Sequence, residues 1–513
     1  MKKCFVFACA LALGTVAAFA AHNPAMAQKA KDTLRFPLND AEAGLDPYLL
    51  PGSFNNTWEA SIFDDLLAFD TKKIEFVPLL AKSWSQPEPT VYEYELCDDV
   101  TWHDGEKLTA DDVVYTINYL IDPTVKLRYK SQWKWIKSVE KLGPYKVRIT
   151  SKSPVPDGMM WMAYNTPIIP QHIHGPLANK ADFAARAIGT GPMKFTKIDK
   201  NAGLVVERYA GFKPSPGKKA AGVGRVVSEV VPDFGTLTAK FLVGDVDVAR
   251  DMPPDQIQAL KESGWAEFTL SAPTLGYTLF GFPTAGAQNV KALGDVRVRQ
   301  AIMKAIDRKA VVRATFGDIA KNIEPVEGLC AKEQLGCGYT KLPPEYDPAG
   351  AKKLLAEAGY PDGFSVTISC FPTGVTEATA ISGMLRQVGI RATVRSHPIA
   401  NRVQMLSQGK VDIGYYGWNG GGMFEVSGQI VRHFLSKEYD DPVMTKMAEE
   451  TMTMMDDKAR RVAVAKLMDY ANEHAYVFPM VSSRILLVHT KEVGLDTSAI
   501  RATQVNPHDF YWK

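Results

Sequence analysis

The sequence predicts an α/β protein with two or three domains, and two observations carry this prediction. Residues 346–368, YDPAGAKKLLAEAGYPDGFSVTI, have the pattern of a helix, a turn and a strand, and residues 382–396, SGMLRQVGIRATVRS, repeat that order. Helices that alternate with strands are typical of α/β domains, so we expect largely parallel sheets. Removal of an N-terminal leader would leave about 486 residues, which exceeds the size of one hydrophobic core.

The first of these segments shows how single elements are predicted. Asp347 is placed to cap a helix, and Pro348 fits its first turn. Gly359 is placed to end the helix, and residues 361–363, Pro-Asp-Gly, form a turn before the strand. The buried face of the helix and the buried side of the strand are expected to comprise Ala351, Leu354, Leu355, Ala358, Phe364, Val366 and Ile368.

The N-terminus has the pattern of an export signal. A basic start at Lys2 and Lys3 precedes an apolar run from Cys4 to Ala21, and residues 25–27, Ala-Met-Ala, offer a small-x-small cleavage site. We therefore expect cleavage after Ala27, with residues 1–27 as the signal peptide, and a mature protein in the periplasm.

The charge of the remaining chain argues against two classes of partner. Residues 1–27 hold two lysines and no acidic residue, so the 59 Lys and Arg fall to 57 and balance the 57 Asp and Glu. A chain without net charge gives no electrostatic reason to bind nucleic acid or an anionic membrane.

The stretch TWHDGEKLTADDVVYTI, residues 101–117, is dense in His, Asp and Glu, and an active site is one interpretation of it. The preceding VYEYEL, residues 91–96, alternates in the manner of a half-buried strand. Thr109 and Asp112 have the spacing of a helix cap, and Asp104-Gly105 supplies a turn. His103 lacks a second imidazole at ligand spacing. We therefore expect this stretch to shape the chain.

These residues also carry a family resemblance. Residues 92–118, YEYELCDDVTWHDGEKLTADDVVYTIN, resemble the signature of the family 5 extracellular solute-binding proteins, which serve peptide, nickel, opine and oligosaccharide ABC importers. Four further segments are similar to the family and occur in its order: the Leu-Asp-Pro turn at 45–47, the Gly-Thr-Gly-Pro loop at 189–192, DVRVRQA at 295–301 with Asp295 as a cap, and the helix–turn–strand unit at 346–368.

The resemblance implies a periplasmic-binding-protein fold of type II, similar to cluster C, with two hinged lobes that close over a solute. Lobe 1 is expected at residues 28–275 plus 485–513, with an inserted subdomain at about 68–184, and lobe 2 at residues 276–484. The implied partners are a membrane permease and an ATPase, and the implied cargo is a small solute, with peptides and peptide-like molecules first. We expect a monomer without a cofactor.

The family's specificity segment corresponds to VDIGYYGWNGGGMFEVSG, residues 411–428, where Trp418 matches the family's tryptophan. Peptide binders of the family carry an aspartate soon after that position, whereas this chain has a glycine run. Glu425 is a candidate replacement for this charge, although helix capping or exposure stays equally open. The candidate solute-binding residues are Asn39, Glu42, Tyr48, Trp133, Tyr277, Tyr416, Trp418, Asn419, Met423 and Glu425.

Other function classes find less support. The sequence contains no Gly-x-Ser-x-Gly and no His-Glu-x-x-His, so a secreted hydrolase remains a distant alternative and the chain is expected not to be an enzyme. His172 and His174 are expected to have capping or surface roles, not metal ligation. Cys330 and Cys337 are placed to close a small disulfide loop. Oligosaccharides, opines, aromatic solutes and nickel chelates stay open as alternative cargo.

Overall fold

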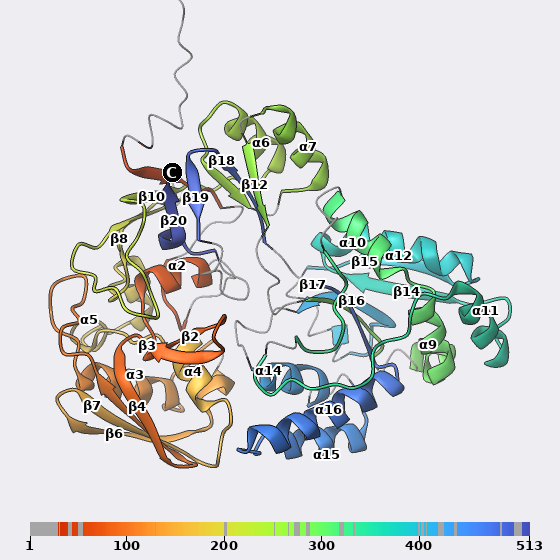
Figure 1. The fold of residues 1–513 in the computed structure, drawn as a ribbon, viewed down its shortest axis with the longest axis horizontal. Coiled ribbons are helices and arrows are strands. Elements are labelled where there is room, and N and C mark those ends of the chain that lie inside the picture. Colours follow the sequence, from red (N-terminus) through yellow and green to blue (C-terminus); the bar gives the residue numbers. More distant parts are fainter. Residues whose placement is uncertain are drawn as a thin grey trace, which may run out of the picture.

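The structure, a computed structural model, places two lobes side by side (Figure 1). The part of the chain that it describes comprises residues 29, 31–38, 44–49, 55–128, 130–199, 203–250, 252–264, 266–270, 277–283, 288–317, 323–331, 334–398, 401, 405–406, 408–418, 425–435, 439–482, 485–496 and 505–513. Within this part, no helix is both long and apolar enough to cross a bilayer.

The first lobe contains a central sheet with the strand order β1-β10-β9-β8. Only β1 and β10 run parallel; the other neighbours are antiparallel. Two short hairpin sheets, β2-β3 and β19-β20, lie in the same lobe. The strands are β1 (Thr33–Arg35), β2 (Leu67–Asp70), β3 (Glu75–Pro78), β8 (Met193–Asp199), β9 (Gly203–Arg208), β10 (Arg225–Ser228), β19 (Val493–Leu495) and β20 (Phe510–Trp512).

A second antiparallel sheet of this lobe has the order β4-β5-β7-β6 and packs against α3 (Ala110–Ile121). The alternation of VYEYEL is confirmed, because β5 (Val91–Leu96) buries Tyr92, Tyr94 and Leu96. The other three strands are β4 (Ala81–Glu88), β6 (Ile136–Gly143) and β7 (Lys146–Ser151). The short helices α2 (Asn55–Ile62), α4 (Gly158–Tyr164) and α5 (Gln171–His174) also belong to this lobe.

The second lobe is built on one sheet of order β15-β14-β16-β13-β17. The expectation of largely parallel sheets is wrong. Here β14 is parallel to β15 and β16, because a crossover helix such as α12 (Val375–Gln387), between β14 and β15, produces parallel neighbours. In contrast, β13 arrives from the first lobe and is antiparallel to β16 and β17. The strands are β13 (Tyr277–Gly281), β14 (Ser365–Cys370), β15 (Arg391–Ser396), β16 (Ile413–Trp418) and β17 (Val477–Ser482).

Helices surround this sheet, and their predicted caps are confirmed. Asp347 Oδ1 accepts a hydrogen bond from Gly350 N (2.8 Å), and Asp295 Oδ1 accepts one from Arg297 N (2.8 Å). Gly359 has a φ of 89°, which glycine adopts without strain at a helix end. The helices are α9 (Val296–Lys304), α10 (Arg308–Phe316), α11 (Pro348–Glu357), α14 (Ser427–Gln429), α15 (Pro442–Thr451) and α16 (Asp457–Glu473).

The chain crosses between the lobes more than once. After β17 it returns to the first lobe as β18 (Leu486–Thr490), which pairs with both β11 (Val248–Arg250) and β12 (Ala266–Leu270). This three-stranded sheet, with α6 (Phe234–Leu242) and α7 (Pro254–Glu262), occupies the top of Figure 1. The lobe boundaries at residues 275, 276, 484 and 485 stay a prediction.

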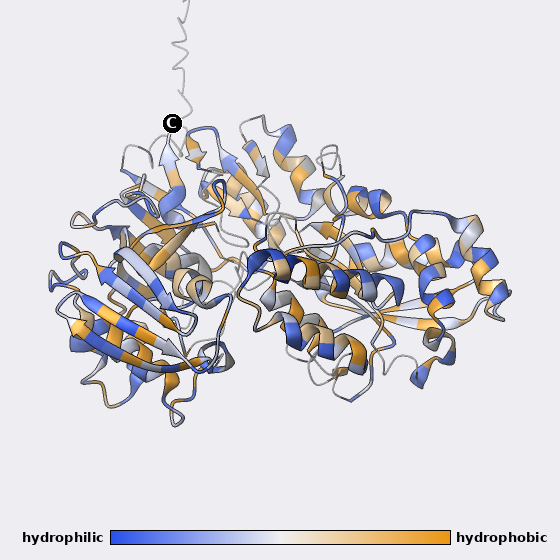
Figure 2. Ribbon diagram, turned by 60° about the horizontal axis from the view of Figure 1, so that its bottom comes forward, coloured by the Kyte–Doolittle hydropathy of each residue, from blue (hydrophilic) through white to orange (hydrophobic). Residues whose placement is uncertain are grey.

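Each lobe has its own hydrophobic core. Figure 2 shows hydrophobic and hydrophilic stretches that alternate along the helix ribbons of both lobes, as expected of helices that bury one face. Trp58, Trp102 and Tyr94 are fully buried in the first lobe, and Phe280, Ile302 and Phe478 are buried in the second. Separate cores allow the lobes to move as units about their connections.

The first lobe also buries an ion pair. Lys218 Nζ donates to Asp64 and to the carbonyl oxygens of Ala60 (2.7 Å) and Phe63 (3.1 Å). Thr190 Oγ1 donates to the second oxygen of Asp64 (2.7 Å). All these partners lie within one lobe, so the pair joins the end of α2, the residues directly after it and the 189–192 loop without a contact from the other lobe.

Candidate functional site

The dense His and Asp stretch is a structural element, as expected. His103 is buried, its Nδ1 accepts from Gly189 N (3.2 Å), and its Nε2 donates to Gly191 O (3.0 Å). Burial lowers the pKa of His103 to about 4, so the ring is neutral at physiological pH. Both nitrogens are used to position the 189–192 loop and are therefore not available to a substrate.

The acidic residues of the same stretch have equally local partners. Thr109 and Asp112 form the predicted capping box of α3. Asp112 Oδ2 accepts from Thr109 N (3.0 Å) and Oδ1 from Gln171 N (2.9 Å), whereas Asp111 pairs with Lys141 (2.7 Å). Across the described residues, no three His, Cys, Asp or Glu side chains are placed to hold a metal ion.

The two histidines of α5 divide between two roles. His172 lies at the surface and its Nε2 is 2.8 Å from Asp104 Oδ2. The expected surface or capping role is wrong for His174, which is buried and forms a hydrogen bond with Tyr115 Oη (2.5 Å). Burial and the neighbouring Lys180 lower the pKa of His174 to about 4. The packing of α5 against α3 has no local signal in the sequence.

The ends of three second-lobe strands meet where the chain passes between the lobes. Tyr277, the first residue of β13, pairs with Trp418 at the end of β16 and with Ser482 at the end of β17. The pairing of β14 with β16 stops at Tyr415, so β16 continues for three residues beyond it. These backbone positions bring Tyr277 and Trp418, two candidates from distant parts of the sequence, next to each other.

Four other candidates lie outside the described residues: Asn39, Glu42, Asn419 and Met423. The side chains of Tyr277 and Trp418 are also not described; only their strand positions are. The structure does describe the side chains of Tyr48, Trp133, Tyr416 and Glu425.

Tyr48 and Trp133 form one buried unit of the first lobe. Their rings meet edge to face at 5.4 Å, and each is 3% exposed. Tyr48 Oη donates to Pro167 O, and Trp133 Nε1 donates to Thr166 Oγ1 (3.1 Å). Both side chains therefore lie inside the first lobe, where they hold the residues around 166–167 in place.

Tyr416 is buried in the second lobe, where its ring packs against Phe371 at 4.9 Å. Because side chains alternate along a strand, Tyr416 and Tyr415 lie on opposite faces of β16. Tyr415 belongs to the core of the second lobe. The Tyr416–Phe371 pair is an aromatic contact whose buried tyrosine lies two residues before Trp418 in the chain.

Glu425 has a partner that the sequence did not indicate. Its carboxylate is 2% exposed and forms an ion pair with Arg460 of α16, while its second oxygen accepts from Ser427 N (2.6 Å) at the start of α14. Arg460 Nη2 also donates to Ser427 Oγ (2.6 Å) and Nε to Thr451 O (3.0 Å). In the sequence Arg460 is one basic residue of a charged helix, with no local signal of burial.

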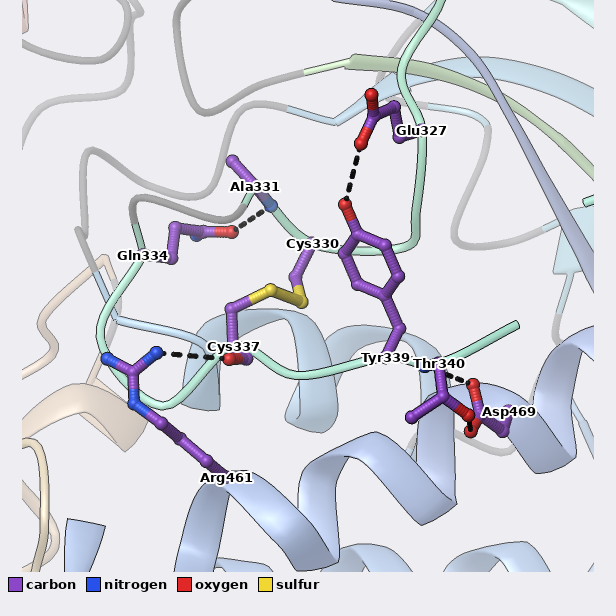
Figure 3. The surroundings of a disulfide bond; sticks show 9 residues. All are labelled: Glu327, Cys330, Ala331, Gln334, Cys337, Tyr339, Thr340, Arg461 and Asp469. Atoms are coloured by element: carbon purple, nitrogen blue, oxygen red, sulfur yellow. Dashed lines mark hydrogen bonds between the residues drawn. A yellow bond between two sulfur atoms is a disulfide. The ribbon is translucent and has the colours of Figure 1, made fainter. Parts of the chain in front are cut away.

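The predicted disulfide is present in the structure between Cys330 and Cys337 (Figure 3). The loop that it closes is anchored on α16, because Arg461 Nη1 donates to Cys337 O (3.3 Å) and Thr340 N to Asp469 Oδ1 (2.9 Å). Val426 N donates to Leu335 O (3.0 Å), which joins the loop to the residue after Glu425.

Comparison with known proteins agrees with this architecture. The chain is 26% identical over 421 residues to the glutathione-binding protein GsiB of Pectobacterium atrosepticum, with 80% of this chain and 78% of that protein covered. Two solved structures cover 94% of this chain and 100% of theirs: NikA of Brucella suis in complex with Fe(III)-EDTA (TM-score 0.82, 20% identity), and a dipeptide-binding protein of Pseudoalteromonas sp. SM9913 in complex with Met-Leu (TM-score 0.77, 17% identity).

The family model of the bacterial extracellular solute-binding proteins, family 5, matches residues 75–439. This range includes the β5–α3 signature, the 189–192 loop and the β16 segment with Trp418. The two-lobed fold and the motif order lead to the same assignment. The chain belongs to the family 5 extracellular solute-binding proteins.

Proposed function

We propose that this protein captures a small peptide or peptide-like solute between its lobes and delivers it unchanged to the permease and ATPase of an ABC importer. The family is one of solute binders, and its relatives include proteins that bind glutathione and the dipeptide Met-Leu. Export with cleavage after Ala27 and a monomeric state belong to the same proposal.

The observation that carries the peptide assignment is the end of β16. Beyond Tyr415 this strand extends past β14, and Gly417 is exposed there. An extended peptide can add its backbone to such a strand edge, where main-chain hydrogen bonds supply affinity and adjacent pockets supply specificity. Trp418 at the last position adds an aromatic surface for a side chain of the solute.

The state of Glu425 refines the kind of solute. A free carboxylate after Trp418 would suit the α-ammonium group of a peptide, but Glu425 is committed to Arg460 and Ser427 N. We therefore place recognition on the backbone of β16 and on the aromatic side chain of Trp418, with the buried Tyr416 as its support from within the second lobe. Asn39, Glu42, Tyr277, Asn419 and Met423 stay candidate contacts.

A ligand screen by thermal unfolding tests this proposal. The panel contains dipeptides, glutathione, an opine, an oligosaccharide, haem and nickel–histidine. A solute at a hundredfold its Kd should stabilise the protein by about 2.7 kcal/mol, which appears as a shift of several degrees in Tm. Recovery of the solute unchanged after incubation distinguishes a carrier from an enzyme.

Two variants locate the site once a ligand is found. Trp418→Ala should weaken binding at least tenfold, because stacking on the aromatic surface is lost. The matched control is Tyr346→Ala, which removes an aromatic side chain that is 48% exposed elsewhere in the second lobe. Equal affinity of Trp418→Ala and Tyr346→Ala for the solute would contradict the placement of the site. If only sugars or metal chelates raised the Tm in the screen, the peptide assignment would be contradicted.

A further inference from the structure

The two lobes are in contact at one edge, away from the strand ends described above. The first lobe contributes Phe69 of β2 and Met160 of α4, both buried, and the second contributes Ala331 and Leu335 from the disulfide-closed loop. Figure 1 shows α4 on the side of the first lobe that faces α14. Opening of the lobes would separate these apolar side chains and expose them to water.

Charged groups lie beside this apolar contact. Asp157 precedes α4, is 4% exposed, and accepts a hydrogen bond from Trp161 Nε1 (3.0 Å). On the second-lobe side stand Glu425 and Arg460, and both act electrostatically on Asp157. A buried carboxyl group of the first lobe therefore lies close enough to a buried ion pair of the second lobe to be influenced by both of its charges.

We propose that these residues form a proton-linked latch, in which closure of the lobes brings the Asp157 carboxyl against the Glu425–Arg460 pair and takes up one proton. The latch comprises Asp157 and Met160 of the first lobe and Leu335, Glu425 and Arg460 of the second. It rests on the proposed function, because closure is the movement that captures the solute.

The geometry explains why a proton is needed. Arg460 already donates to Glu425, Ser427 Oγ and Thr451 O, so little of its guanidinium remains to neutralise a second carboxylate. Within the first lobe Asp157 faces Trp161, an uncharged donor, and Tyr92 of β5, a neutral phenol. A protonated Asp157 removes the repulsion from Glu425 at no cost to the Arg460 pair.

The direction of the linkage follows from the environments of Asp157 in the two forms. In the closed form, burial first and the Glu425 charge second raise the pKa of Asp157 to about 7, and Arg460 opposes this only in part. Opening removes Glu425 and exposes the carboxyl, so its pKa returns toward about 3.9. At a pH between these two pKa values, closure is accompanied by uptake of a proton by Asp157. Acidification therefore favours the closed form.

The disulfide-closed loop holds the second-lobe half of the latch in place. Gly336 passes so close to the ion pair that a Cβ there would lie 2.6 Å from Arg460 Nη1 and 3.1 Å from Glu425 Oε1. A parallel β-bridge between the backbones of Leu335 and Glu425 joins the apolar contact of the second lobe to its ion pair. The disulfide between Cys330 and Cys337 closes this loop, which holds Leu335 and the Glu425–Arg460 pair in fixed positions opposite α4.

The first experiment needs no solute. Small-angle scattering is recorded at about pH 5.5 and about pH 8 for the wild type, for Asp157→Asn and for the control Asp99→Asn, an exposed carboxyl of the same lobe. Asn keeps the acceptor for Trp161 and carries no charge. We expect the wild type and Asp99→Asn to be more compact at the lower pH, and Asp157→Asn to be equally compact at both. Persistence of the wild-type pH dependence in Asp157→Asn would overturn the proposal.

A second experiment uses a solute from the screen. The wild-type Kd should fall about tenfold between about pH 8 and about pH 6, because one proton per site changes Kd by at most about tenfold per pH unit and the uptake takes place mainly below about pH 7. Asp157→Asn should bind with a pH-independent Kd. An identical pH slope in the two proteins would refute the latch and leave solute binding intact. If no solute on the panel binds, the proposed function fails, and the scattering result still decides on the latch.

Discussion

Two buried ion pairs among the described residues, Asp64–Lys218 and Glu425–Arg460, have surroundings that differ in a way that separates structure from motion. Asp64 and Lys218 are surrounded by partners of their own lobe: Lys218 Nζ also donates to the carbonyl oxygens of Ala60 and Phe63, and the second oxygen of Asp64 accepts from Thr190 Oγ1. Glu425 and Arg460 are matched by their own lobe as well, yet a third charged group, Asp157, approaches them from the other lobe.

The difference shows which kind of ion pair can influence the opening and closing of the lobes. A pair that is complete within one lobe contributes the same free energy whether the lobes are open or closed, so it can only set stability. A pair with an extra carboxyl across the boundary has a different free energy in the two forms, and a conformational equilibrium shifts only through such a difference. Four measurements test this difference between the two pairs.

The largest effect is expected at the first pair. Lys218→Met leaves Asp64 buried without its cation, and the free energy of unfolding should fall by about 3–5 kcal/mol. Chemical unfolding measures this loss. The dependence of lobe closure on pH should be unchanged, because Lys218 does not face the second lobe. A change in that dependence would show that the two pairs are coupled.

The second measurement concerns pH and the first lobe alone. The pKa of His103 is lowered to about 4 by burial, below the ordinary value near 6.5, so its contribution to stability is present above pH 6.5 and is lost as the pH falls toward 4. The loss should be on the order of 2 kcal/mol in the wild type and absent at this site in His103→Gln. Equal acid sensitivity of the two proteins in chemical unfolding would contradict the buried neutral ring. Protonation here opposes folding, whereas at Asp157 it favours closure.

The third measurement removes the disulfide. Cys330→Ser/Cys337→Ser frees an eight-residue loop, which should lower the free energy of unfolding of the second lobe by about 2 kcal/mol. Compactness at the lower pH should also decrease, because the loop no longer presents Leu335 to Met160. Cys97→Ser is the matched control, since Cys97 is not disulfide-bonded. A double variant that closes normally would assign the disulfide to stability alone.

The smallest effect is expected for Leu335→Ala. This change removes apolar contact across the lobe boundary worth about 1 kcal/mol, so solute binding should weaken about fivefold. The unfolding free energy should change little, and the pH dependence should persist because the charges remain. Leu342→Ala, at a side chain that is 61% exposed, provides the control. If Leu335→Ala lowered the free energy of unfolding without weakening solute binding, Leu335 would contribute to the core of the second lobe and not to the contact between lobes.

Local rules predicted much of the fold. Hydrophobic alternation predicted β5, and the spacing of Thr109 and Asp112 predicted the capping box of α3. The caps at Asp295 and Asp347 and the cysteine pair were equally visible, because each depends on residues within a few positions of one another. Strand direction was not, since β13 and β17 are placed by the passage of the chain between lobes.

The candidate site was predicted only in part for the same reason. The structure pairs Trp418 with Tyr277 across two strands, and their contact with a solute stays a prediction. Tyr48 and Trp133 were candidate solute-binding residues, but both are buried, and their hydrogen bonds to residues 166–167 make them internal supports. Arg460 and Asp157 carry no local signal at all, because their meaning arises from contacts between segments that are remote in the chain.

The placement of β18 has a consequence for the order in which the protein can fold during synthesis. This strand lies between β11 and β12, and Trp512 near the C-terminus donates to Asp32 Oδ1 near the N-terminus (3.1 Å). A polypeptide that emerges with its N-terminus first therefore has a gap in the middle of that sheet until residues 486–490 arrive. The lobe that begins first is finished last, and no nascent chain can trap cargo before its synthesis is nearly complete.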